Sequence, residues 1–207
     1  MSAADSRSLI DRAHRTFDRL SRYHEIAKVG DIARRYFAMN AFDGVLTSLG
    51  ILVGAFVGGV HQASAVVSVV ASAAASVGVS GAYGSFLIER AERGRALREL
   101  ERSTLSRLHD TEIGAASRYA AVVIAIIDGL SPAVASAIIL VPFLVVGRGR
   151  VHAAFYAGGA IAFVELFLLG MFLGRVSRER LFFSGLKLVL AGVISLGLSL
   201  LLNVGKL

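Results

Sequence analysis

Five blocks of apolar residues constrain the fold of this chain more than any other feature of its sequence. Each block is long enough for the roughly 20 residues with which an α-helix crosses a hydrocarbon core. In lipid, only helices and closed barrels satisfy every backbone hydrogen bond, and unbroken apolar runs of this length are typical of helices. The sequence therefore predicts an all-α integral membrane protein with five transmembrane helices, at about 37–60, 64–88, 119–147, 151–174 and 182–204.

The composition agrees with a membrane protein and excludes some chemistry. Of the 207 residues, 55% are hydrophobic and only 18% are charged, and the mean hydropathy is +0.67. Because the sequence has no cysteine, disulfides, thiolate metal sites and a cysteine nucleophile are excluded. We expect neither an enzyme nor a permanently bound cofactor.

The basic residues gather in alternate connections between the blocks. Eight precede the first block and seven lie in 89–118, whereas 61–63 contains none. Because cytoplasmic loops are enriched in Lys and Arg, we expect the N-terminus and 89–118 in the cytoplasm, and we expect the membrane to be a prokaryotic cytoplasmic membrane. The net charge of +7 then reflects this topology and contact with anionic membrane lipid, so nucleic-acid binding is not needed to explain it.

Residues 5–30 are predicted to form an amphipathic helix. Its arginines surround one apolar stripe, which consists of Ile10, Ala13, Phe17 and Leu20. The stripe could lie on the inner membrane surface or pack on the cytoplasmic loop, and the sequence leaves both open. We therefore divide the chain into a cytoplasmic helix, 1–36, and a transmembrane domain, 37–204, that includes the cytoplasmic loop 89–118.

The loop 89–118 has the pattern of a helix that continues from the second block. Opposite charges stand four residues apart in Glu89–Arg93 and Arg95–Glu99, as on a solvated helix with ordinary side-chain pairing. The alternative is a surface that collects metal ions. Its acidic and histidine residues would be Glu89, Glu92, Glu99, Glu101, His109, Asp110 and Glu112.

Small residues recur every four positions in the first two blocks. Such stripes let helix backbones approach closely in a membrane. The stripe in the second block is long enough to serve a second copy of the chain as well as a neighbouring helix, so we hypothesise a homodimer. The residues are Gly50, Gly54 and Gly58 in the first block, and Ser64, Ser68, Ser72, Ser76, Ser80 and Gly84 in the second.

Three acidic residues interrupt the apolar blocks: Asp43, Asp128 and Glu165. An ionised side chain at the centre of a bilayer costs roughly 2.5–3.5 kcal/mol on insertion scales. The first two begin an Asp-Gly echo, "FDGVLTSLGILVGAF" and "IDGLSPAVASAIILVPF", which indicates two parallel repeats. Pro132 also removes the helical partner of the Asp128 carbonyl.

Carboxylates and carbonyl oxygens suit hard or borderline divalent ions such as Mn²⁺ and Fe²⁺. If the acids exchange such an ion for protons, the two fluxes are coupled. The three acids together therefore favour a cation/proton antiporter, provided that they converge on one pocket.

Two segments resemble the vacuolar iron transporter family: "AFDGVLTSLGILVGAF" at 41–56 and "GAYGSFLIERAERGRALRELE" at 81–101. The resemblance covers about 40–204 and implies a dimeric carrier that moves Fe²⁺ or Mn²⁺ out of the cytoplasm in exchange for protons. The family's first-span acid falls on Asp43. The chain is a divergent member, because Gly81 and Ser85 stand where the family usually has Met and Glu.

Other functions remain open on the sequence alone. A non-transporting membrane scaffold would use the small-residue stripes for assembly, and a carrier of a different substrate would use the same acids. An intramembrane aspartyl protease would pair Asp43 with Asp128. Residues 125–128 read "AIID", however, and lack the GxGD arrangement of such enzymes.

Overall fold

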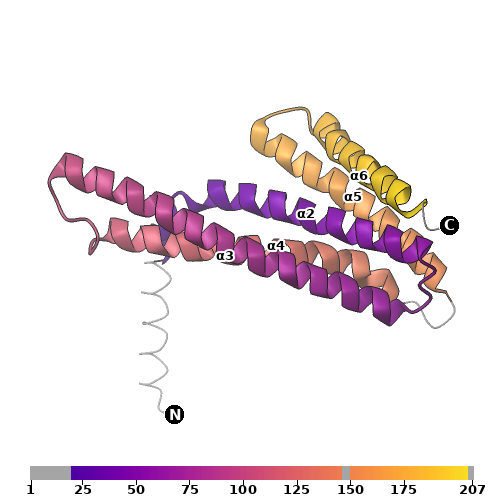
Figure 1. Ribbon diagram of the computed structural model, residues 1–207. Coiled ribbons are helices and arrows are strands. Elements are labelled where there is room, and N and C mark those ends of the chain that lie inside the picture. The colour runs from indigo at the N-terminus through magenta and orange to yellow at the C-terminus, as the bar shows by residue number, and fades with distance from the viewer. Residues whose placement is uncertain (1–19, 146–149, 205–207) are drawn as a thin grey trace, which may run out of the picture. The chain divides into compact units, whose positions relative to one another are not determined.

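All regular structure in the described part of the chain is helical. The computed structural model describes residues 20–145 and 150–204. Its main elements are α2 (Val29–Val57), α3 (Ala63–Thr104), α4 (Glu112–Val145), α5 (Val151–Ser177) and α6 (Leu181–Val204) (Figure 1). All five are long and apolar enough to cross a membrane. The prediction of an all-α membrane protein with five transmembrane helices is confirmed.

Helix α2 begins well before the first apolar block. Helix α2 begins at Val29, ahead of the block at 37, because a turn at residues 27–28 separates it from the helical residues 20–26. At this turn Lys28 has a φ of 48°, a left-handed conformation that ends a helix. The predicted helix over 5–30 is therefore interrupted near its end, and its residues 5–19 lie outside the described residues.

The predicted continuation of the second block is confirmed as far as Thr104. Helix α3 runs without a break over 42 residues, or about 63 Å at 1.5 Å per residue. Helix α4 begins at Glu112, so most of the loop 89–118 is helical and only residues 105–111 join α3 to α4.

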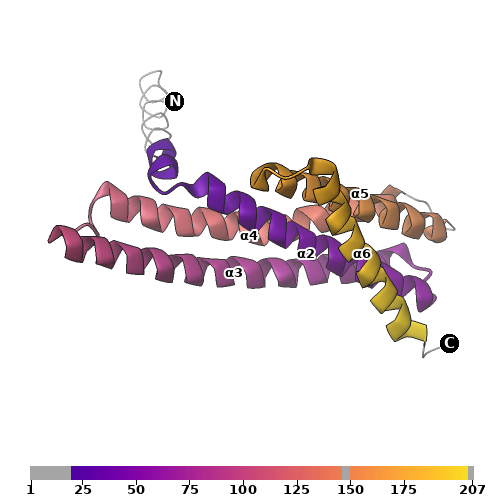
Figure 2. The same ribbon diagram turned by 90° about the horizontal axis from the view of Figure 1, so that it is seen from above.

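Contacts divide the chain into two compact units. Among the described residues, unit 1 comprises 20–34 together with 83–126, and unit 2 comprises 35–82 together with 127–145 and 150–204. In unit 1 the C-terminal part of α3 and the N-terminal part of α4 lie side by side as a hairpin (Figure 2). The Tyr23 and Tyr119 rings, 6.1 Å apart between centroids, pack the residues before α2 onto this hairpin.

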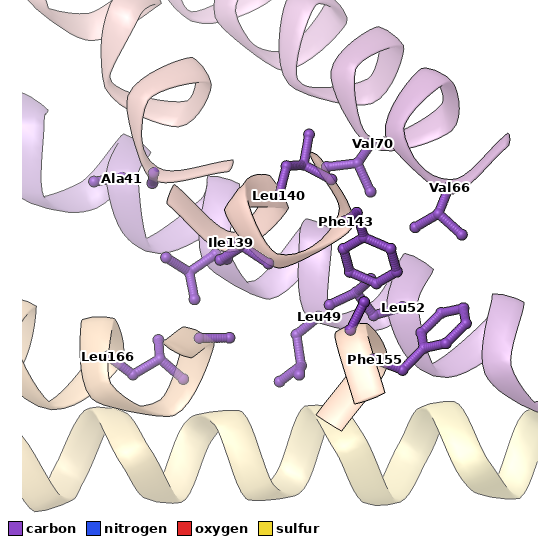
Figure 3. Packing of buried hydrophobic residues seen from close by; sticks show 14 residues of the cluster. Ala41, Leu49, Leu52, Val66, Val70, Ile139, Leu140, Phe143, Phe155 and Leu166 are labelled. Carbon is purple, nitrogen blue, oxygen red and sulfur yellow. The ribbon is translucent and has the colours of Figure 1, made fainter. Parts of the chain in front are cut away.

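Unit 2 has an apolar core formed by α2, α3, α4 and α5. Its buried side chains include Leu49, Ile139, Phe143 and Leu166 (Figure 3), and the rings of Phe143 and Phe155 meet edge to face at 5.1 Å. Because lipid tails are as apolar as these side chains, the core is held by close packing and dispersion rather than by exclusion of water.

The serine stripe of α3 does not contribute to this core. Ser64, Ser68, Ser72, Ser76 and Ser80 are all exposed on the chain. In the other stripe, a Cβ at Gly54 would meet nothing within 4 Å, and one at Gly50 would lie 3.8 Å from Ser199 Oγ. The stripes therefore do not produce the closest helix contacts within the chain, and their role in a homodimer remains a prediction.

Candidate functional site

A polar site lies in unit 2 where α2, α3 and α4 meet. Asp128 of α4 is 3% exposed and Asn40 of α2 is 8% exposed. The Asn40 side-chain amide donates a hydrogen bond to the Asp128 carboxylate. A Cβ added at Gly81 of α3 would lie 3.2 Å from both Asn40 Oδ1 and Asp128 Oδ2. Beside Gly81 there is thus only the small space that a Cβ would fill, bordered by two side-chain oxygens.

Glycines allow these helices to approach one another. A Cβ at Gly44 would lie 2.6 Å from Pro132 Cα, and one at Gly78 would lie 2.4 Å from the Gly129 carbonyl oxygen. Real Cβ atoms do not come this close to backbone, so any larger residue would force the helices apart. The glycine of each Asp-Gly pair is therefore a packing residue, Gly44 against α4 and Gly129 against α3.

Helices α2 and α4 contact each other in a constant register. Asn40 meets Asp128, Gly44 meets Pro132, and Ser48 Oγ donates a hydrogen bond to Ser136 Oγ at 2.9 Å. The contacts recur every four residues on both helices and in the same direction, as expected of one face of each of two parallel helices. In both hydrogen-bonded pairs the residue of α4 follows its partner in α2 by 88 positions.

This register does not place Asp43 opposite Asp128. The Asp-Gly echo relates Asp43 to Asp128, but the contact register pairs Asp128 with Asn40. Asp43 is exposed on unit 2, because it lies about 100° around α2 from Gly44, which faces α4. The structure therefore leaves Asp43 outside the Asp128 site.

Glu165 of α5 lies in a second polar position within the same unit. Both of its carboxylate oxygens are buried, and neither has a hydrogen-bond partner among the described residues. The surrounding pocket has a volume of about 230 Å³. Apart from Glu165 itself and Ser131 of α4, its wall is apolar. The Ser131 hydroxyl donates to the Ile127 carbonyl. Ser131 follows Asp128 by less than one turn of α4. The Glu165 pocket therefore borders the stretch of α4 that carries Asp128.

Of the three predicted acids in unit 2, Asp128 and the carboxylate oxygens of Glu165 are buried, whereas Asp43 is exposed. In residues 20–145 and 150–204, no group of three or more His, Cys, Asp or Glu side chains could hold a metal ion. The space beside Gly81 and the Glu165 pocket are two polar positions along α4. A cation in either would depend on hydroxyl, amide or carbonyl oxygens in addition to one carboxylate.

The acids of the predicted metal-collecting surface in unit 1 are largely engaged with other groups. Glu89 is 4% exposed and pairs with Arg93 at 2.9 Å, and Glu99 pairs with Arg95 at 3.0 Å. Glu101 Oε1 accepts hydrogen bonds from two backbone amides of the loop at 2.7 and 3.1 Å.

The remaining members of the predicted metal-collecting surface are exposed. Glu112 lies 3.9 Å from Arg22, His109 lies 3.3 Å from Asp110, and the side chain of Glu92 is exposed. Within the described residues these groups form no cluster of three. Pairing with an arginine four residues away accounts for Glu89, which is buried, and for Glu99, which is exposed, and metal collection stays a prediction.

Sequence reasoning missed the part that Asn40 and Gly81 play. Asn40 directly precedes the first Asp-Gly segment, and an amide inside an apolar block is a signal that it needs a buried partner. Gly81 was noted only as a departure from the family pattern. Its significance depends on which oxygens face it, and the chain order does not reveal that.

Comparisons with known proteins give one relative of interest. The chain is 30% identical over 172 residues to the uncharacterized protein MJ0645 of Methanocaldococcus jannaschii, a match that covers 82% of this chain and 87% of the relative. No family model matches the chain, and no solved structure matches it.

Proposed function

We propose that this chain, which belongs to the same family as MJ0645, carries divalent metal cations such as Fe²⁺ or Mn²⁺ across a membrane in exchange for protons. The observation that carries the proposal is Glu165, whose two buried carboxylate oxygens have no hydrogen-bond partner among the described residues. A buried carboxylate without a partner is too costly to persist as a bare anion. It must hold either a proton or a cation.

The exchange of a proton for a cation on Glu165 would couple metal transport to proton transport. A proton and a metal ion compete for the same oxygens, so metal binding at Glu165 releases a proton and metal departure lets one return. Asp128 belongs to the stretch of α4 that borders the Glu165 pocket. It offers a second carboxylate, which the Asn40 amide already orients. We infer that an ion uses these two positions in succession along α4.

The available donor atoms favour hard or borderline ions. Asn40 and Asp128 both present side-chain oxygens to the space beside Gly81. Oxygen ligands suit Mn²⁺ and Fe²⁺ better than soft ions. The absence of cysteine removes the thiolates that soft ions prefer.

The proposed direction and assembly rest on the sequence. The distribution of basic residues favours a cytoplasmic N-terminus, and the resemblance to the vacuolar iron transporter family implies export from the cytoplasm. We propose a homodimeric, divergent member of that family in a prokaryotic cytoplasmic membrane. Crosslinking in native membranes would detect the dimer.

The test is transport by the purified chain in proteoliposomes, with a metal-sensitive dye and a pH dye inside. Addition of Fe²⁺ or Mn²⁺ should move metal and protons in opposite directions. Glu165→Gln and Asp128→Asn should each reduce both fluxes by about tenfold or more, which corresponds to roughly 1.4 kcal/mol. Glu25→Gln, an exposed acid outside every candidate metal position, is the matched control and should transport normally. Unchanged flux in both site variants would refute the proposal.

A membrane scaffold is the second candidate, favoured by the serine stripe of α3, whose residues are exposed on the chain. Such a stripe could serve self-association. A scaffold should assemble normally and show no metal flux, whether or not Glu165 is present. Flux that depends on Glu165 separates the two candidates.

A further inference from the structure

We propose that a pocket lined by arginines in unit 1 binds the phosphate group of an anionic ligand. The pocket lies between the C-terminal part of α3 and the N-terminal part of α4 and has a volume of about 460 Å³. Its wall includes the arginine set Arg90, Arg93, Arg98 and Arg118, which we call the arginine pocket. This inference does not depend on the transport function proposed above.

Two glycines line the pocket. Gly94 of α3 forms part of the wall, and a Cβ there would lie 3.5 Å from Arg98 Nη1. A Cβ at Gly114 would lie 2.3 Å from the His109 carbonyl oxygen, so only glycine lets the loop pass so close to α4. Arg118 Nη1 donates to the same carbonyl at 3.1 Å and fixes the rim.

The charge of the wall is strongly positive. Its one carboxylate belongs to Glu101, which already accepts two backbone amides at 2.7 and 3.1 Å. Glu89, which is not part of the wall, pairs with Arg93 at 2.9 Å. Within the described part of the chain, Arg90, Arg98 and Arg118 have no carboxylate within salt-bridge distance. These three guanidinium groups are therefore available to an anion.

Phosphate is the anion that fits this arrangement. The planar guanidinium group donates two parallel hydrogen bonds to phosphate oxygens, and arginines from two helices can approach a tetrahedral group from several sides. The same positive wall opposes the binding of a divalent cation. The arginine pocket is therefore not expected to bind metal ions, unlike the metal-collecting surface that the acids of 89–118 suggest.

The two ends of the pocket differ in polarity. Phe86, Ala121 and Val122 line it within the apolar blocks, whereas Arg98 and His109 line it beyond them. Basic pockets between transmembrane helices at the cytoplasmic side bind lipid headgroups, and an apolar end beside a basic end matches an acyl chain beside a phosphate. A phosphate in solution would use the same guanidinium groups without the apolar end.

The test separates the two sources of phosphate. The full-length chain, stripped of lipid in detergent, is titrated with phosphatidylglycerol, with phosphatidylcholine and with inorganic pyrophosphate, and bound ligand is counted by native mass spectrometry. The double variant Arg90→Gln/Arg98→Gln should bind the anionic ligand about tenfold or more weakly. The control Arg95→Gln/Arg102→Gln removes equal charge from the same helix outside the arginine pocket, and should bind as the unaltered chain does.

Each outcome has one meaning. Preference for phosphatidylglycerol over phosphatidylcholine that the pocket variant alone loses supports a lipid headgroup. Pyrophosphate binding that the pocket variant alone loses supports a soluble phosphate. Equal binding of both lipids without pyrophosphate binding overturns the proposal, and so does an equal loss in both double variants, which would indicate diffuse surface charge. The four substituted arginines, Arg90, Arg95, Arg98 and Arg102, are all exposed, so both double variants should fold. Unchanged thermal unfolding midpoints would verify this.

Discussion

Glu89 in unit 1 and Glu165 in unit 2 are both glutamates removed from solvent on long helices, and their surroundings are opposite. Glu89 has Arg93 at 2.9 Å, and Arg93 also donates to the Ala27 carbonyl at 3.4 Å. Glu165 has no hydrogen-bond partner among the described residues. Burial alone therefore does not mark a candidate site. A buried charge with a partner supports the fold, whereas one without a partner needs a ligand or a proton.

The largest effect on stability is expected at the paired acid. Glu89→Gln leaves the Arg93 guanidinium, whose side chain is 16% exposed, without its carboxylate. Breaking a buried pair at one partner costs about 3 kcal/mol. Thermal unfolding in detergent should show this as a clearly lowered midpoint. Glu99→Gln is the control, because the Arg95–Glu99 pair is exposed and is worth under about 1 kcal/mol. Equal effects of the two substitutions would remove the contrast on which the comparison rests.

The next effect tests the close contact of α3 with α4 in unit 2. Gly78→Ala would place a methyl group 2.4 Å from the Gly129 carbonyl oxygen and should cost about 2 kcal/mol through overpacking. Gly54→Ala is the matched control, because its Cβ meets nothing within 4 Å and alanine is the better helix former. Unfolding midpoints in detergent check both. A tolerated Gly78→Ala would mean that these helices are not in tight contact.

A smaller effect of opposite sign is expected at the unpaired acid. Glu165→Leu removes a polar group whose buried oxygens have no partner, so it should raise stability by about 1 kcal/mol while it abolishes transport. Unfolding midpoints and metal flux measured on the same preparation check this. Lowered stability would show that Glu165 has a structural partner and would make it resemble Glu89.

The smallest effect concerns a surface pair between α6 and the loop that precedes it. The hydrogen bond from Lys187 to Glu179, followed by the Lys187 charge and the Ser184 hydroxyl, lowers the pKa of Glu179 below its usual 4.5. A carboxyl group with a lower pKa in the folded state contributes stability above its unfolded pKa and loses it as the pH falls through the folded value. The unfolding midpoint of the unaltered chain should therefore fall slightly more between neutral and acidic pH than that of Lys187→Gln. Identical pH profiles would contradict this prediction.

The sequence predicted the helices better than the contacts between them. Block length was sufficient to predict five spans, because lipid leaves few alternatives for an apolar backbone, and the charge pattern of 89–101 was sufficient to predict the continuation of α3. The turn at Lys28 was not predicted, since its left-handed φ has no signal such as glycine at that position.

The candidate site shows where prediction from sequence ends. The apolar surroundings of Asp128 and Glu165 predicted that both acids are removed from solvent. The Asp-Gly echo suggested that Asp43 belongs with them, but packing follows the positions that face α4, which pair Asp128 with Asn40. The echo aligns Asp128 with Asp43, whereas the contacts pair Asp128 with Asn40, three residues earlier. This shift cannot be inferred from the sequence of either helix alone.

The contact of Gly44 with Pro132 has a consequence for how this chain can vary. Here backbone rests on backbone, so no change of side chain elsewhere could accommodate a larger residue at 44. Its neighbour Asp43 is exposed and can change in size or charge without moving a helix. The packing thus constrains two adjacent positions very differently, and a saturation scan for folding should find an abrupt boundary in tolerance between them.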